Sequence, residues 1–234
     1  MKLIFIILLT KRKKYDIITI SNLKNKRKEK IIMKLLIVVD AQNDFIDGAL
    51  GSKEAQVAVP KIVERINKSM NEIVLFTKDT HDIYYSDTRE GKKLPVAHCI
   101  ENTDGWCINK AIRGAWKDNP NTILLNANQN YGLHINNTIY KPTFGSVALM
   151  NFIKELHNSI TYDLKENTHI STKIDTIEFC GFCTDICVIS NVLMIKALLP
   201  EVDIIVNSEL CAGVTPEKHE AALEVMRSCQ IEVI

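Results

Sequence analysis

The chain has 234 residues, of which 46% are hydrophobic and 24% are charged, a composition typical of a soluble globular protein rather than of a disordered or fibrous one. This length is sufficient for one α/β domain with a sizeable core. The formal net charge of +1 conceals an asymmetry: residues 1–32 carry ten Lys or Arg and two acidic residues, which makes this segment +8 and leaves the remainder at −7.

The basic segment 1–32 is expected to lie outside the folded domain, as a disordered extension or upstream of the true start, because a strand-like run begins at Met33. A basic tail can also bind nucleic acid or an acidic membrane surface. The apolar stretch 3–9 is too short to cross a bilayer, and no small-residue cleavage site follows it. We therefore expect a cytoplasmic protein without a nucleic-acid or membrane partner. The odd number of cysteines, seven, favours reduced thiols over a disulfide framework.

Apolar runs alternate along the chain with segments of helical periodicity, which predicts a mainly parallel sheet. Strands are expected at 35–39, 73–77, 137–140, 174–179, 203–206 and 231–234, and helices at 57–70, 146–157, 184–199 and from Thr215 onward. Residues 82–121 are predicted to form a long functional loop or lid, and residues 158–173 a surface connection. The expected fold is a three-layer, Rossmann-like α/β domain over residues 33–234, an open parallel sheet with helices on both faces. The sequence has no Gly-x-Gly-x-x-Gly or Walker loop, so no nucleotide cofactor is expected.

Three residues with reactive side chains lie where a strand ends or the next element begins. Asp40 follows the strand 35–39, Lys141 follows 137–140, and Cys187 lies in the first turn of the helix 184–199. Ligands bind at the carboxyl edge of such sheets, so the three could form a thiol nucleophile with a base and a cation. A thiol in a first helical turn is also expected to have a favoured thiolate. The alternatives are a turn cap for Asp40, a surface charge for Lys141 and a core thiol for Cys187.

Three segments carry a resemblance to a known family. Asp40-Ala-Gln-Asn-Asp-Phe45, Lys141 before Pro-Thr-Phe-Gly-Ser, and Gly181-Phe-Cys-Thr-Asp-Ile-Cys187-Val188 resemble the signatures of the isochorismatase-like cysteine hydrolases, the superfamily of the nicotinamidases. The resemblance implies that Asp40 is the general base, Lys141 the cation that stabilises the thiolate, and Cys187 the nucleophile. It also implies an oxyanion hole formed by the backbone N–H groups of Cys183 and Cys187, and a cis peptide bond between Phe182 and Cys183.

The same resemblance implies a metal site formed by Asp79, His81 and His98, whose nitrogen and oxygen donors suit Zn²⁺, Fe²⁺ or Mn²⁺. The family's usual Trp-Pro-x-His-Cys is here Leu94-Pro-Val-Ala-His-Cys99, with one additional residue between proline and histidine. The alternative is that both histidines only form hydrogen bonds within the loop.

The resemblance therefore implies a cysteine amidohydrolase that cleaves a small planar amide to acid and ammonia through a thioester on Cys187, with nicotinamide as the first candidate. Phe45, Phe144 and Trp106 are expected to form aromatic walls around a flat ring, although core packing would also explain each of them. Activities on carbamoyl, ureido or maleamate amides stay open. A different class is a thiol–disulfide oxidoreductase, because Cys180-Gly-Phe-Cys183 is a C-x-x-C between strand and helix. The third is a non-catalytic binding protein. The resemblance also implies a homo-oligomer.

Overall fold

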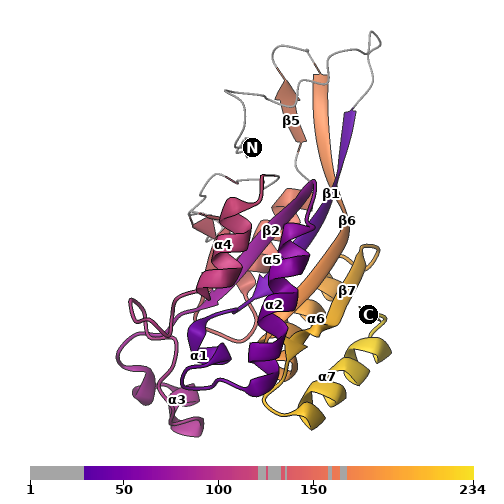
Figure 1. Ribbon diagram of the computed structural model, residues 1–234. Helices are drawn as coiled ribbons and strands as arrows, with labels where there is room; N and C mark the ends of the chain where they lie inside the picture. The colour runs from indigo at the N-terminus through magenta and orange to yellow at the C-terminus, as the bar shows by residue number, and fades with distance from the viewer. Residues whose placement is uncertain (1–28, 121–124, 126–132, 135, 158–159, 164–167) are drawn as a thin grey trace.

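The computed structural model describes residues 29–120, 125, 133–134, 136–157, 160–163 and 168–234. In these ranges one sheet contains eight strands: β1 (Glu29–Val39), β2 (Glu72–Asp79), β3 (Leu133–His134), β4 (Thr138–Lys141), β5 (Ile160–Asp163), β6 (Thr168–Phe182), β7 (Asp203–Ala212) and β8 (Glu232–Val233). The strand order is β3-β4-β2-β1-β6-β7-β8, with β5 paired to β6 (Figure 1). Only the β3–β4 and β5–β6 pairs are antiparallel among these strands. The expected open, mainly parallel α/β sheet is therefore confirmed.

Helices cover both faces of the sheet, and short helical elements occupy the segment after β2. The helical elements are α1 (Asn43–Ile46), α2 (Lys53–Asn67), η1 (Tyr85–Asp87), α3 (Arg89–Lys93), α4 (Lys110–Asp118), α5 (Val147–His157), the π-helical turn η3 (Thr184–Val188), α6 (Ile189–Leu198) and α7 (Pro216–Ser228). Helices α2 and α4 pack together on one side, whereas α5 packs against α6 on the other (Figure 1). None of the helices in the described ranges has the length and apolar character that a membrane crossing needs.

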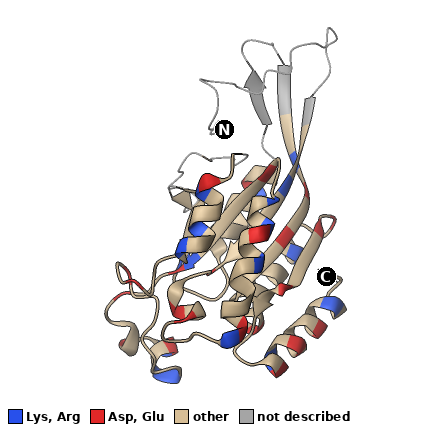
Figure 2. Cartoon of the chain, viewed as in Figure 1, with Lys and Arg blue, Asp and Glu red and all other residues tan. Residues whose placement is uncertain are grey.

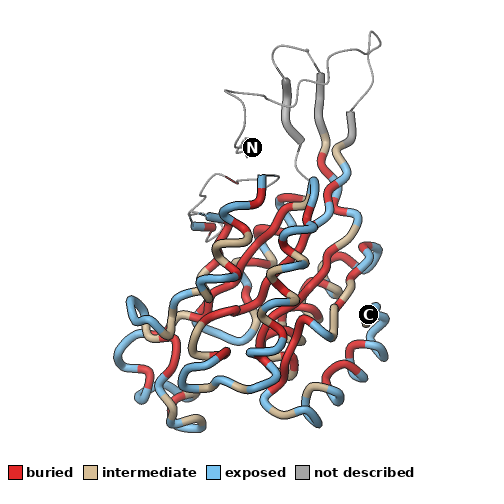
Figure 3. Tube along the Cα trace, viewed as in Figure 1, coloured by how far each residue is buried: buried red, intermediate tan, exposed pale blue. Residues whose placement is uncertain are grey.

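The core lies along the central strands, which are buried on both faces (Figure 3). The run from Leu35 to Val39 has exposed fractions of 0–2%, as its uninterrupted apolar sequence predicts for a covered parallel strand. Helix α2 is additionally held by Arg65, whose guanidinium pairs with Glu178 of β6 at 2.7 Å and Glu72 of β2 at 2.8 Å. In Figure 2, charges of both signs are interspersed along α2 and α7, while the sheet behind them is largely uncharged.

Two strands begin earlier than the sequence predicts. Strand β1 begins at Glu29 instead of Met33, so the expected domain boundary between residues 32 and 33 falls inside a strand, and residues 1–28 of the predicted extension lie outside the described residues. Strand β6 begins at Thr168, within the segment 158–173 that was expected to be an irregular connection. The reason is mutual pairing: residues 29–33 of β1 pair with residues 170–174 of β6, and β5 pairs with the other edge of β6.

Candidate active site

The reactive residues of the chain meet at the carboxyl edge of the central strands. Asp40 directly follows β1, while Asp79 and Lys141 are the last residues of the neighbouring strands β2 and β4 and stand opposite each other in the parallel register. Cys187 lies in η3, directly after β6. Because β4, β2, β1 and β6 are consecutive in the sheet, the chain connections place the four side chains in one small volume.

Lys141 is the centre of this group. Its Nζ lies 2.6 Å from Asp40 Oδ2, 3.2 Å from Asp79 Oδ1 and 3.4 Å from Cys187 Sγ. The three partners and the ammonium itself are all buried, with exposed fractions between 0% and 4%. Asp40 is oriented by Thr77, whose hydroxyl donates to Asp40 Oδ1 at 2.7 Å. The alternatives of a turn cap for Asp40 and a surface charge for Lys141 do not fit this geometry.

Burial and the neighbouring charges shift the pKa of each titratable group in this cluster. Burial raises the pKa of Cys187 well above its ordinary value; the ammonium of Lys141 opposes this shift, and Asp40 and Asp79 reinforce it. Burial also raises the pKa of Asp40, although Lys141 acts in the opposite direction. Burial alone would lower the pKa of Lys141, but the charges of Asp40, Cys187 and Asp79 hold it well above its usual range. Burial of Cys187 thus opposes the expected thiolate, whereas the ammonium of Lys141 beside it favours that form, and the favoured thiolate stays a prediction.

The turn between β6 and Cys187 requires unusual backbone conformations. Gly181 has φ +116°, and a Cβ at this position would collide with the backbone of Val39 in β1, so glycine allows the two strands to approach here. The next peptide bond, between Phe182 and Cys183, is cis, which confirms the prediction. Val188 N–H donates to the Cys183 carbonyl at 3.0 Å and closes the π-helical turn. First-turn N–H groups have no acceptor within their own helix, so the N–H groups of Cys183 and Cys187 stay the predicted oxyanion donors.

Asp79, His81 and His98 form a compact buried cluster beside the lysine. One possible ligand atom from each residue lies within 4.8 Å of the others. His81 Nε2 is 3.0 Å, and His98 Nε2 3.6 Å, from Asp79 Oδ2. Burial alone would raise the pKa of Asp79, but hydrogen bonds from the two imidazoles and the charge of Lys141 hold it well below its ordinary value. Two imidazole nitrogens and a carboxylate oxygen are donors that Zn²⁺, Fe²⁺ and Mn²⁺ accept, so the set fits a divalent metal.

Neighbouring groups orient these three side chains. His98 Nδ1 lies 2.9 Å from the Val96 carbonyl, and a proton held there leaves the Nε2 lone pair for a metal. The amide of Gln42, which is fully buried, donates to the Asp79 carbonyl at 2.9 Å and accepts from Asp79 N–H at 2.7 Å. Glu90 of α3 is a further carboxylate, 3.8 Å from both imidazole Nε2 atoms. Glu90 was not predicted from the sequence, because it belongs to no recognised motif and comes near the cluster only through the fold of residues 82–98.

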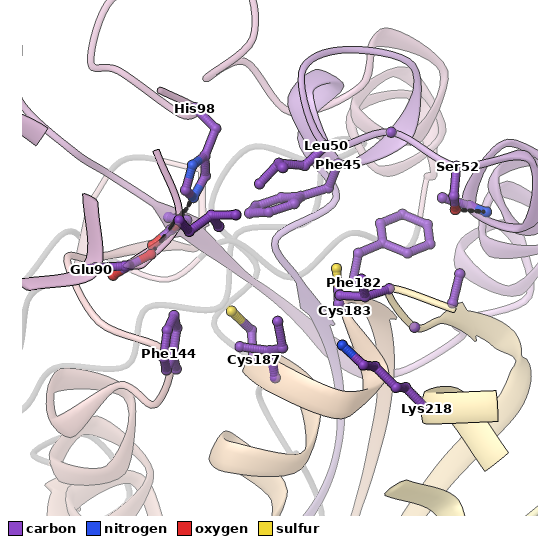
Figure 4. Close-up of a pocket in the computed structure, with 18 residues that line it drawn as sticks. Phe45, Leu50, Ser52, Glu90, His98, Phe144, Phe182, Cys183, Cys187 and Lys218 are labelled. Atoms are coloured by element: carbon purple, nitrogen blue, oxygen red, sulfur yellow. Dashed lines mark hydrogen bonds and ion pairs between the residues drawn. The ribbon is translucent and has the colours of Figure 1, made fainter. Parts of the chain in front are cut away.

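A cavity of about 250 Å³ opens onto Cys187 (Figure 4). The predicted wall residues Phe45 and Phe144 both line it, as do His98 and Glu90 at one end. Lys218 of α7, which was not predicted from the sequence either, lies at the other end (Figure 4).

The third predicted wall residue, Trp106, is not among the described residues that line this cavity. Its indole N–H donates to Thr80 Oγ1 at 2.9 Å, and its ring covers the ammonium of Lys78. Trp106 therefore packs behind the site, and the prediction that it faces the substrate is wrong for this cavity.

Comparison with known families agrees with the resemblance found in the sequence. Residues 150–234 match the family model of the isochorismatase domain. The matched segment includes the Cys187 turn and excludes Asp40 and Lys141. A search of curated protein sequences found no match.

Solved structures with the same fold include several nicotinamidases. The nicotinamidase/pyrazinamidase of Bacillus subtilis has a TM-score of 0.62 and 23% identity, over 86% of this chain and 98% of that one. The pyrazinamidase/nicotinamidase of Streptococcus mutans has a TM-score of 0.63 and 22% identity, over 86% and 99%. The pyrazinamidase of Pyrococcus horikoshii, solved in complex with zinc, has a TM-score of 0.58 and 22% identity, over 86% and 98%. At these identities the likeness establishes the fold. The resemblance is thus confirmed: residues 150–234 match the isochorismatase domain family, and the chain has the fold of its nicotinamidase-like hydrolases.

Proposed function

We propose that the protein is a cysteine amidohydrolase that cleaves a small planar amide to an acid and ammonia through a thioester on Cys187. The observation that carries this proposal is the contact of Lys141 Nζ with both Asp40 Oδ2, at 2.6 Å, and Cys187 Sγ, at 3.4 Å, beside the cavity. A nucleophile, a base and a cation in mutual contact are the arrangement that nucleophilic catalysis requires.

In the first half-reaction Asp40 takes the proton of the Cys187 thiol as the sulfur attacks the amide carbon. The raised pKa of Asp40 suits this role, because a carboxylate with a higher pKa is a stronger base near neutral pH. Lys141 stabilises the negative charge as it moves from Asp40 to the sulfur. The tetrahedral oxyanion accepts hydrogen bonds from the N–H groups of Cys183 and Cys187. The C–N bond then breaks, Asp40 returns the proton to the leaving nitrogen, and ammonia departs.

In the second half-reaction water cleaves the thioester. Asp40, again a carboxylate, removes a proton from the attacking water, and the same two N–H groups hold the new oxyanion. The C–S bond breaks, the sulfur regains its proton from Asp40, and the acid is released. Each turnover therefore consumes one amide and one water and returns all three side chains to their starting protonation states.

Asp79, His81 and His98 are the residues that would hold a divalent metal in this enzyme. Such an ion supplies Lewis acidity and a fixed binding position for a lone-pair donor of the substrate. Asp79 also acts directly on Lys141: the two side chains pair at 3.2 Å, which helps to fix the ammonium between Asp40 and Cys187.

Nicotinamide is the first substrate that we propose to test. The proposal is supported by the nicotinamidases among the proteins of the same fold and by Phe45 and Phe144, which offer ring faces on the cavity wall. The cavity of about 250 Å³ is smaller than the roughly 300–1,000 Å³ of sites for drug-sized ligands, which agrees with a single ring.

The test compares ammonia release by the wild type and three variants, Cys187→Ala, Cys183→Ala and Cys180→Ala. We expect Cys187→Ala to stay folded and lose turnover. Cys183→Ala should retain turnover because the proposed contribution of this residue is its backbone N–H. Undiminished ammonia release by Cys187→Ala would refute the assignment.

The same variants address the oxidoreductase alternative. Cys180 is fully buried, and burial raises its pKa well above the ordinary value and raises the pKa of Cys183 to about 12. Thiol–disulfide exchange needs an accessible thiolate, so this pair is poorly suited to it. Insulin reduction by the wild type that disappears in Cys180→Ala would favour the alternative.

A further inference from the structure

Lys218 is a charged side chain at the end of the cavity away from the metal-ligand cluster. It lies in the first turn of α7 and belongs to the cavity lining (Figure 4). The described residues form no ion pair with its ammonium. The lining around it comes from apolar side chains and glycine, including Phe182, Ile186 and Val214. A substrate in the cavity therefore meets an ammonium that has no carboxylate partner of its own.

The position of Lys218 relative to Cys187 is fixed by two contacts between α7 and the η3 turn. Thr184 Oγ1 is 2.8 Å from Nδ1 of His219, the residue after Lys218, and Thr184 itself is fully buried. Asp185 Oδ1 accepts from Val214 N–H at 2.8 Å in the loop before α7. Because η3 also carries Cys187, the helix that presents the lysine is held to the turn that presents the nucleophile. Such preorganisation lets a side chain discriminate between substrates.

The two ends of the cavity differ in charge. Asp79 and Glu90 lie at the end that holds His98, and Lys218 lies at the opposite end, with Cys183 and Cys187 between them (Figure 4). At the first end Asp79 is already paired with Lys141 and with the two imidazoles that would share a metal with it, so its charge does not act on a substrate alone. At the second end an anionic substituent meets the ammonium of Lys218 while the scissile amide lies at Cys187.

We infer that Lys218 is a specificity-determining residue that selects amides carrying a carboxylate over neutral amides of the same shape. This inference rests on the proposed amidohydrolase function and narrows its substrate class to the monoamides of small dicarboxylic acids. Nicotinamide is then a substrate with lower kcat/KM, because it has no anionic group for Lys218. Lys218 is exposed, so solvent weakens its pairing with a carboxylate, and the expected preference in kcat/KM is about two- to fivefold.

The experiment uses two pairs of amides that differ in charge at nearly constant shape: 3-carbamoylbenzoate with 3-acetylbenzamide, and succinamate with 4-oxopentanamide. Ammonia release is measured for these four compounds and nicotinamide with the full-length protein. We expect at least one carboxylate to be preferred about two- to fivefold over its neutral partner, with the preference weakened by added salt. Lys218→Met should remove the preference, whereas Lys218→Arg should retain it.

Lys154→Met is the matched control, because this lysine of α5 is exposed and does not line the cavity. It should behave as the wild type. Equal kcat/KM within both pairs, or a preference that persists in Lys218→Met, would overturn the inference while leaving the amidohydrolase intact. Failure to release ammonia from all five amides would contradict the proposed function itself.

Discussion

The buried pair of Asp40 and Lys141 gives the sharpest test of the site's energetics. Their exposed fractions are 0% and 1%, and the two charged atoms are 2.6 Å apart. Removing one partner of such a pair leaves the other charge in a medium that solvates it poorly, which destabilises a protein by about 3–5 kcal/mol. Replacing both partners by uncharged groups of similar size removes that penalty and is often close to neutral.

The two single substitutions should differ because Asp79 also contacts the lysine, at 3.2 Å. In Asp40→Asn the ammonium keeps Asp79 as a partner, so the expected loss of unfolding free energy is at the low end, about 3 kcal/mol. Lys141→Met removes the ammonium that contacts both buried carboxylates, and the expected loss is about 5 kcal/mol. Independent effects would add to about 8 kcal/mol, whereas we expect the double variant to lose at most about 5 kcal/mol.

Urea denaturation of the wild type, both single variants and the double variant at pH 7 measures these quantities. Unchanged m-values would show that the variants unfold from a native state of the same compactness. A double variant that loses the full sum would mean that the two charges do not interact, which would contradict their shared role in the site. All three variants should also lose ammonia release, since each lacks the base, the cation or both.

Three further predictions concern pH, metal and backbone. A pH–rate profile should show kcat/KM falling on the acid side with a midpoint above pH 3.8, the ordinary aspartate pKa. The reason is that burial raises the pKa of Asp40, and protonated Asp40 cannot accept the thiol proton. A midpoint at or below pH 3.8 would contradict this role of Asp40. Protein purified without a His-tag should contain a divalent metal by mass spectrometry, and His98→Ala should lower the stoichiometry while His134→Ala, at an exposed position, should not. Gly181→Ala should destabilise the protein by about 3 kcal/mol, because the positive φ strains an alanine and its Cβ collides with β1. In Gly114→Ala of α4 the added Cβ meets nothing within 4 Å, so this variant should be more stable by about 0.5–1 kcal/mol. Thermal or urea unfolding measures both changes.

Buried strands were predictable because their sequences are apolar without interruption. The run 35–39 could be recognised as a strand without knowing which strands pair with it, since few other secondary-structure elements bury five consecutive apolar residues. The early part of β6, from Thr168, has the mixed sequence Thr-His-Ile-Ser-Thr-Lys, which carries no such pattern. What makes it a strand is pairing with β1 on one side and β5 on the other, and pairing partners are not visible in a local window.

Candidate site residues were predictable where they belong to motifs attached to strand ends, and the others were not. Asp40, Lys141 and Cys187 follow predictable elements, so the parallel topology alone brings them near one another. Glu90 and Lys218 come from α3 and α7, whose approach to the cavity depends on tertiary packing. The sequence offered no property that distinguishes them from the other charged residues of the chain.

The additional residue before His98 illustrates how local geometry can preserve a site despite a change in spacing. Three interactions accommodate it: His98 Nδ1 contacts the carbonyl of Val96 only two residues away, Cys99 has the positive φ of 47°, and Cys99 N–H donates to Asp44 Oδ2 at 2.7 Å. The loop thus turns tightly on both sides of His98. Asp44 belongs to the motif after β1, and its carboxylate fixes the loop at Cys99, directly after the histidine. His98 Nε2 still lies 3.6 Å from Asp79 Oδ2. The donor set is therefore maintained by a contact between two motifs, and Asp44→Ala should lower metal content although Asp44 is not among the three proposed ligands.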